Sequence, residues 1–144
     1  MNKTLVVNDK TLNRIARAIG GFVTVAGVMH FANPSFFDDI VPPWLPPGER
    51  FWTYASGVVE LGVGPMLFSR KYRKQGALAA IALFVGVYPA NIYMVWDWRN
   101  EEIGKQLVAY GRLPFQFVFI GLAWKVFQNT SRQGDSPNKV VTTE

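Results

Sequence analysis

The sequence predicts an all-α integral membrane protein, a bundle of four transmembrane helices. First, four apolar segments are separated by short charged or proline-rich stretches. Second, the Lys and Arg residues alternate between the two sides that such a bundle would have. Third, Glu60 lies near the middle of one apolar segment. A charge there costs about 2.5 to 3.5 kcal/mol on insertion scales and normally faces the protein interior. We therefore expect a polar site around Glu60.

Composition excludes several classes of function. The chain has 144 residues, which fits one domain, and it contains no cysteine and one histidine. The lack of cysteine rules out disulfides, thiol redox chemistry and thiolate metal sites within the chain, and a metal site built from protein ligands alone is not expected. The net charge of +5 comes from basic residues beside apolar segments. This placement favours a lipid bilayer, and not nucleic acid, as the partner.

The first predicted helix covers residues 14–32. Arg14 and Arg17 precede an apolar run that ends near His30. A signal peptide would begin in the same way, but no small-x-small cleavage pattern follows the run. This segment therefore reads as an uncleaved transmembrane helix.

The next segment, up to Arg50, is too rich in proline to be a membrane helix. It also carries too many apolar side chains, Trp44 among them, for a merely solvated loop. Because tryptophan rings favour the membrane interface, we expect a rigid cap lying there.

The second helix is predicted at residues 51–69, about the 20 residues needed to cross a bilayer. Ser56 lies one turn before Glu60 and shares its face. Pro65 should bend the helix. Its glycines, Gly57, Gly62 and Gly64, allow a neighbouring helix or a ligand to approach closely.

The third and fourth helices are predicted at residues 76–96 and 112–128. The third contains the run from Tyr88 to Asn91, in which Pro89 introduces a kink beside an amide. In the fourth, Arg112 and Gln116 are one turn apart on the same face. Residues 97–111 read as a mixed-charge connection. The membrane domain would then cover residues 1–128, with a polar cytoplasmic tail at 129–144.

Charge distribution predicts the orientation of the bundle. Of the fifteen Lys and Arg residues, eleven lie in the two terminal segments and the turn after the second helix, and four lie on the opposite side. Basic residues concentrate on the cytoplasmic side of membrane proteins, so both termini are expected in the cytoplasm. We expect a multi-pass protein of the bacterial inner membrane.

In this topology, polar side chains from all four helices gather in the outer half of the bundle. We take seven residues as candidate binding residues: His30, Ser56, Glu60, Tyr88, Asn91, Arg112 and Gln116. Structural roles stay open for most of them. Glu60 could pair with Arg112 as a packing clasp, or Arg112 could extend to the interface. His30 could cap its helix, and Asn91 could satisfy carbonyls that the Pro89 kink frees. Tyr88 could belong to the belt of aromatic residues that lies at the membrane interface.

Several motifs together resemble the DoxX-like family of small four-helix membrane proteins. They are GVMHFANPSFFDDIVPPWLPPG, WTYASGVVELGVG, YPANIYM and RLPFQ, and they extend from about Arg14 to Trp124. In that family a His-Phe-x-x-Pro start, a Gly-x-x-Glu-Leu in helix two, a Pro-Ala-Asn in helix three and an Arg-Leu-Pro-x-Gln in helix four recur. The resemblance implies a link to quinone reduction or to membrane complexes that handle oxidative stress.

The expected function is an accessory membrane subunit that binds a quinone-like or lipid-like small molecule in an outward-facing polar pocket. A membrane redox enzyme is the implied protein partner, and a homo-oligomer stays open. A quinone is the ligand suggested, whereas haem is not expected because there is no second histidine. Two alternatives remain: an intramembrane enzyme using Glu60 and His30 as an acid–base pair, with no catalytic residue otherwise identified, or a purely structural assembly protein.

Overall fold

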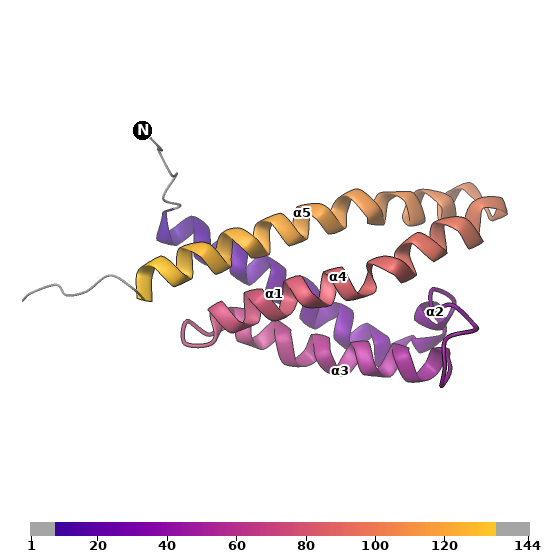
Figure 1. Cartoon of the computed structure of the whole chain (residues 1–144), viewed down its shortest axis with the longest axis horizontal. Helices are drawn as coiled ribbons and strands as arrows, with labels where there is room; N and C mark the ends of the chain where they lie inside the picture. Colours follow the sequence, from indigo (N-terminus) through magenta and orange to yellow (C-terminus); the bar gives the residue numbers. More distant parts are fainter. Residues whose placement is uncertain (1–7, 135–144) are drawn as a thin grey trace, which may run out of the picture.

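The computed structural model describes residues 8–134, and this part of the chain is helical without any strand. Figure 1 shows its elements. They are α1 (Asp9–Ala32), α2 (Pro34–Asp38), α3 (Glu49–Phe68), α4 (Arg73–Asp97), the 3-10 turn η1 (Trp98–Asn100) and α5 (Ile103–Gly134). The all-helical prediction is confirmed for this part. The predicted tail beyond residue 134 lies outside the described residues.

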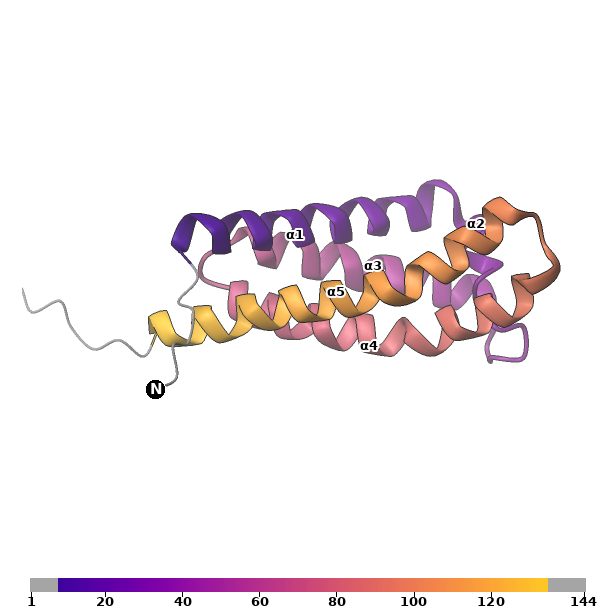
Figure 2. The ribbon, with the colours of Figure 1, turned by 90° about the horizontal axis from the view of Figure 1, so that it is seen from above.

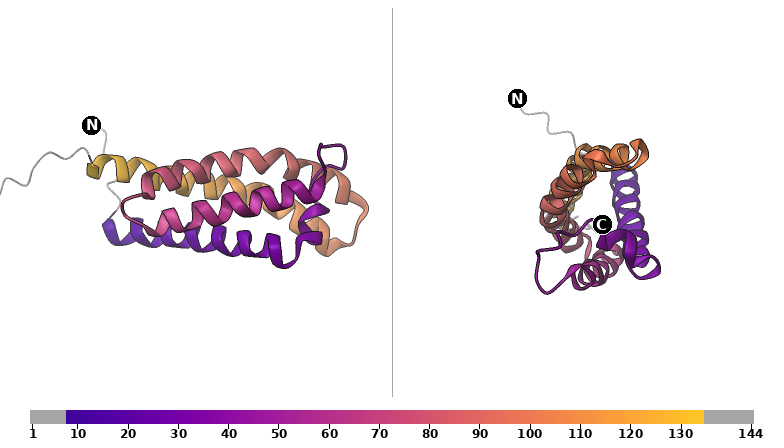
Figure 3. Two further views of the ribbon diagram at one scale, coloured as in Figure 1. Left: turned by 90° about the horizontal axis from the view of Figure 1, so that it is seen from below. Right: turned by 90° about the vertical axis from the view of Figure 1, so that its right-hand side faces the viewer.

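The four long helices form one elongated bundle in which successive long helices run in opposite directions (Figures 1 and 2). Helix α1 packs along α3, and α4 packs along α5. The bundle closes through α3 against α4 and through a shorter contact between α1 and α5. These last two helices diverge toward the end that carries α2 (Figure 1), and the views in Figure 3 show the short helix and its loop lying across that end.

Three helices are long and apolar enough to cross a membrane. These are α1, the continuous segment Arg73–Asn100 and the segment Ile103–Ser131. Helix α3 has 20 residues but does not reach that apolar content, chiefly because Glu60 lies within it. The structure therefore shows a helical protein with three membrane-capable helices, and α3 as a fourth span stays a prediction.

The predicted boundaries of the fourth helix were wrong. Residues 97–111 were expected to form a connection, but α5 begins at Ile103 and runs through residue 128 to Gly134. Mixed charge did not prevent a helix, because Lys105 forms an ion pair with Glu101 at 3.1 Å and Gln106 donates to the Glu101 carbonyl. Arg112 therefore lies about 13.5 Å inside the helix and not at its start.

At the other end of the chain, α1 begins five residues before its predicted start. The side chain of Asn8 accepts a hydrogen bond from the Lys10 backbone at 3.0 Å. An N-cap of this kind satisfies one of the otherwise unpaired amides of the first turn. The polar residues before Arg14 thus continue the helix inside the described range.

The core is divided into two clusters. The larger one fills the half of the bundle near the chain termini and includes Leu12, Ile19, Leu67 and Val126. The smaller one lies under α2 and consists of Ile40, Met94, Trp98 and Ala109. The polar side chains predicted as a site lie between the two clusters.

Glycines bring α1 and α3 unusually close together. A Cβ atom at Gly64 would collide with Oγ1 of Thr24 and lie 2.9 Å from the Gly20 carbonyl. At a second close contact between the same two helices, nearer the cap, a Cβ at Gly57 would lie 2.8 Å from Cβ of His30. Small residues of this kind allow helix backbones to approach closely in membrane bundles. The close contact at Gly57 sets the distance between His30 and α3.

The predicted cap is present as α2 and the turns that follow it. Asp38 is its anchor: the Arg50 guanidinium lies 2.7 Å from the carboxylate, and the Thr53 hydroxyl donates to it at 2.7 Å. Burial alone would raise the pKa of Asp38, but the hydrogen bonds from Arg50 and Thr53 outweigh it and hold that pKa below its usual value. Trp52 ties the other end of the cap through a hydrogen bond to the Pro46 carbonyl.

Candidate functional site

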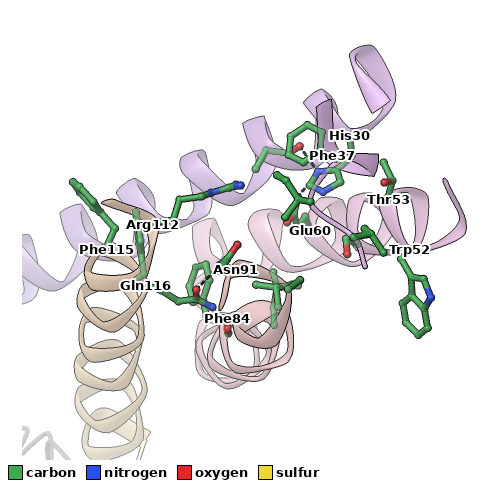
Figure 4. Close-up of a pocket in the computed structure, with 18 of the residues that line it drawn as sticks. His30, Phe37, Trp52, Thr53, Glu60, Phe84, Asn91, Arg112, Phe115 and Gln116 are labelled. Atoms are coloured by element: carbon green, nitrogen blue, oxygen red, sulfur yellow. Dashed lines mark hydrogen bonds and ion pairs between the residues drawn. The ribbon is translucent and has the colours of Figure 1, made fainter. Parts of the chain in front are cut away.

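A cavity of about 170 Å³ lies between the two core clusters and is lined by residues of the four long helices and the cap. Its size is close to that of an engineered protein cavity of about 150 Å³ that takes up benzene. The polar side chains that line it are His30, Thr53, Ser56, Glu60, Asn91, Arg112 and Gln116. Figure 4 shows most of them converging from different helices. The remaining lining is mostly aromatic and aliphatic.

Regular spacing on each helix places these side chains in one cavity. On α1, the lining residues Phe22, Ala26 and His30 recur every four positions and therefore share a face. On α5, Arg112 and Phe119 are seven positions apart, which again puts them on one face. In both helices the polar residue is nearer the cap. The cavity therefore has a polar end under the cap and an apolar end toward the middle of the bundle.

His30 and Glu60 form the closest charged contact in the cavity. Nδ1 of His30 lies 3.1 Å from Oε2 of Glu60 and 2.8 Å from the Ala26 carbonyl oxygen. Nδ1 can carry one proton, and of these two neighbours only the Ala26 carbonyl oxygen has hydrogen-bond geometry toward it. Oε2 of Glu60 is buried and, within residues 8–134, has no hydrogen-bond donor. Phe37 of the cap stacks on the other side of the imidazole, with ring centroids 3.7 Å apart.

Arg112 supplies a cation on the opposite wall. Its side chain extends from α5 toward His30 and Glu60 (Figure 4). No carboxylate of the described residues lies within 4.0 Å of the guanidinium, and its Nη1 donates a hydrogen bond to Sδ of Met94 at 3.9 Å. The carboxylate of Glu60 thus contacts His30 and not Arg112, which differs from the clasp that one interpretation of the sequence considered. The guanidinium donors remain directed at the cavity.

Asn91 and Gln116 form a clasp between α4 and α5. Nδ2 of Asn91 donates to Oε1 of Gln116 at 2.5 Å, and Nε2 of Gln116 donates to the carbonyl oxygen of Phe84. Both amide side chains are buried. Asn91 does not satisfy a carbonyl freed by Pro89 in its own helix, as one interpretation of the sequence expected. The two amides instead fix the spacing of α4 and α5 at the floor of the polar end.

Comparison with known proteins identifies the family. Residues 19–127 match a family described as Domain of unknown function (DUF8561), and this range covers well over half of the chain. The chain belongs to the DUF8561 family. No curated protein matches it. Nor does any solved structure match.

In this DUF8561 protein, six of the seven predicted binding residues line the cavity; Tyr88 is the exception. The Tyr88 ring instead packs against α5, 5.3 Å from the ring of Phe117 in an edge contact.

Sequence reasoning missed part of the lining. Thr53 is seven residues before Glu60 and so lies on the same face of α3, a signal that spacing alone offered. Phe22, Phe115 and Phe119 were not singled out either, because an aromatic residue in an apolar helix is ordinarily lipid-facing or core. Phe37 was unforeseeable, since its position depends on how the cap folds over His30.

The arrangement can bind a small polar head group within an apolar wall. It offers an acceptor without a donor at Glu60, cationic donors at Arg112 and an imidazole at His30. Within the described range, no three His, Asp or Glu side chains lie together as metal ligands would. Binding through hydrogen bonds and charge is therefore the chemistry that these residues support.

Proposed function

We propose that this DUF8561 protein is a DoxX-like membrane subunit that binds a quinone-like or lipid-like molecule in the cavity between its two core clusters. The observation that carries the proposal is that two groups face the same cavity: Glu60 has a buried oxygen without a hydrogen-bond donor, and the Arg112 guanidinium extends toward it from α5. Buried polar groups are otherwise nearly always hydrogen-bonded. A ligand that carries both a donor and an acceptor would satisfy both sides.

The size and lining of the cavity support a ring-sized head group. A cavity of about 170 Å³ accommodates a benzene-sized ring with little space to spare. Ligand sites combine a mainly apolar wall with a few placed polar groups, which is the composition of this lining. A carbonyl on the ring would accept from Arg112. A hydroxyl, as on a reduced quinone, would donate to Glu60.

The proposal includes a topology of four spans with both termini in the cytoplasm of a bacterium. Helix α3 runs alongside the membrane-capable α1, and its 20 residues extend about 30 Å, the thickness of the hydrocarbon core. The Lys and Arg distribution supports the orientation. Because the chain has no cysteine, Trp44→Cys in the cap should react with an impermeant maleimide outside intact cells, whereas Lys71→Cys should not. The opposite pattern would refute the topology.

The test of binding is to purify the protein in mild detergent and identify, by mass spectrometry and absorption, what co-purifies. We expect a quinone or lipid with the wild type and its loss in Glu60→Gln and in Arg112→Gln. Tyr88→Phe is the matched control, because it removes a hydroxyl outside the cavity. Helix content measured by circular dichroism checks that each variant is folded.

Two results would contradict the proposal. A wild type with no bound molecule, together with a Glu60→Gln variant that does not fold, would make Glu60 a structural clasp. Retention of the molecule in both folded cavity variants would place its site elsewhere. A bound ligand would not by itself identify the redox partner. We propose an accessory role because the sequence contains no motif for a catalytic nucleophile or a cofactor.

The 3.1 Å contact of His30 with Glu60 favours one second candidate, an enzyme that moves a proton within the membrane. A positioned acid or base contributes about 10²- to 10⁴-fold to a rate. Turnover of a small hydrophobic substrate by the purified protein alone, lost in Glu60→Gln, would distinguish this enzyme from a binding subunit.

A further inference from the structure

A second property of the cavity concerns how a ligand reaches it. Two aromatic residues, Phe22 of α1 and Phe115 of α5, line the cavity and yet are 51% and 64% exposed on the outside of the bundle. Phe119 of α5 also lines it and stacks on Phe22, with ring centroids 4.5 Å apart. A side chain that lines the cavity and is also exposed on the outside of the bundle is a single layer between the cavity and the surroundings. That place is the seam between α1 and α5.

The seam is thin because the two helices separate there. They touch over a short length, and their ribbons diverge toward the cap (Figure 1). The stacked pair Phe22–Phe119 lies between them. The Phe22 ring is exposed, and an exposed aromatic ring reorients far more readily than a helix moves. A gate that opens by rotation of Phe22 away from Phe119 therefore does not disturb the bundle.

The seam also lies at the right depth to face lipid chains. Phe22 is the fourteenth of the 24 residues of α1, and Phe119 is the seventeenth of the 29 residues of the membrane-capable segment Ile103–Ser131. Both are thus near the middle of their helices. A bilayer around those helices would place its hydrocarbon core, and not its head groups, against the seam.

The opposite exit, through the cap, is held closed. Asp38 is bonded to Arg50 and Thr53, and Phe37 lies on the His30 ring. Trp52 is bonded to the Pro46 carbonyl, and its indole points away from the cavity (Figure 4). The cap therefore covers the polar end with directional bonds, whereas the seam is closed by ring contacts alone.

We propose that the cavity takes its ligand from the bilayer through the seam between α1 and α5, with Phe22 and Phe119 as the gate. The occupant is an amphiphile with a ring-sized head bearing an acceptor oxygen and with an apolar tail. The cavity holds a benzene-sized ring but no long chain as well, so the tail lies in the seam and reaches the lipid. The head then points to Arg112 and Glu60 under the cap. This inference rests on the proposed function.

The experiment locks the seam reversibly. Because the chain has no cysteine, Phe22→Cys/Phe119→Cys places the only two thiols on either side of it. A short bifunctional thiol reagent that reductant cleaves then ties α1 to α5. The same protein is measured locked and released, so a folding defect cannot be mistaken for a closed gate. The matched control is Tyr88→Cys/Phe117→Cys, which ties α4 to α5 at an aromatic contact outside the cavity.

The probe is a decyl-substituted benzoquinone added to phospholipid vesicles that contain the protein. Quinone bound to the protein is measured at timed intervals by rapid detergent extraction and affinity capture, with Arg112→Gln subtracted as background. We expect locking of the seam to slow this uptake about tenfold or more, because binding then requires a rearrangement that the lock forbids. Cleavage of the reagent should restore the rate, and the control pair should show no change.

Two other outcomes refute the idea at different levels. Uptake at the same rate in locked and released protein would overturn the lateral entrance while leaving the binding function intact. No bound quinone above the Arg112→Gln background in the released protein would overturn both the entrance and the proposed quinone-like ligand.

Discussion

Replacement of Gly64 by alanine should destabilise the bundle, because this glycine lies at the closest approach of α1 and α3. The added methyl would collide with Oγ1 of Thr24 and lie 2.9 Å from the carbonyl oxygen of Gly20. Thr24 can rotate away only by giving up its 2.7 Å hydrogen bond to Gly20, worth about 1 kcal/mol. The carbonyl is backbone, so the helices must also separate, and overpacking of this kind costs about 1 to 3 kcal/mol.

Part of this cost is offset by helix propensity. Alanine is favoured over glycine by about 1 kcal/mol in a helix interior. The net loss for Gly64→Ala is therefore about 1 to 3 kcal/mol. Gly62→Ala is the matched control in the same helix, two residues away: a Cβ there meets nothing within 4 Å, so it should gain up to about 1 kcal/mol. We expect the two variants to differ by about 1 to 4 kcal/mol.

The assay is reversible unfolding of both variants in mixed detergent micelles, followed by circular dichroism, with the wild type measured alongside. The midpoint should fall for Gly64→Ala and stay or rise for Gly62→Ala. A Gly64→Ala variant as stable as the Gly62→Ala control would show that the glycines do not set the α1–α3 distance. The position of His30 against Glu60 would then need another explanation.

Two further predictions concern the amide clasp and the cap. Gln116→Leu should lower the free energy of unfolding by about 1 to 3 kcal/mol, because it leaves the buried Asn91 amide without its hydrogen-bond partner. Adding Asn91→Leu should recover part of that loss. Additive losses in the unfolding assay would contradict a shared clasp. The pKa of Asp38 is lower in the folded protein than its usual value, so its contribution to stability is complete above the usual value of 3.8 and is lost as the pH falls through the lower folded-state value. Thr53→Val removes a hydrogen bond that lowers this pKa, so the stability that Asp38 contributes should be smaller and its loss should be complete at a higher pH; the same fall in thermal unfolding midpoint below pH 3.8 as in the wild type would argue against the anchor.

Sequence alone was sufficient for the helical class and for most of the polar cluster. Four apolar segments predict helices because only helices satisfy their own backbone hydrogen bonds in an apolar environment. Glu60 stood out because a charge amid apolar residues requires an interior partner. Spacing on single helices then linked it to Ser56, and linked Arg112 to Gln116, since periodicity is a local property of the chain.

Contacts between helices could not be predicted in the same way. Charge alone left Arg112 open as a partner for Glu60, but the close approach of the helices at Gly57 brings His30 within 3.1 Å of the carboxylate. Asn91 meets Gln116 across the bundle because both side chains are long enough to reach between helices whose spacing the sequence does not state. Which groups pair depends on that spacing.

The residues determined where polarity occurs along the chain, and hence that this DUF8561 protein has a polar layer among apolar helices. Tertiary structure decided that the layer surrounds a cavity, that the cap closes one end, and that α1 and α5 separate beside it. The physical reason is that helix periodicity follows from local backbone geometry, whereas voids and entrances arise from the angles at which helices cross. Those angles reflect the whole set of packed side chains at once.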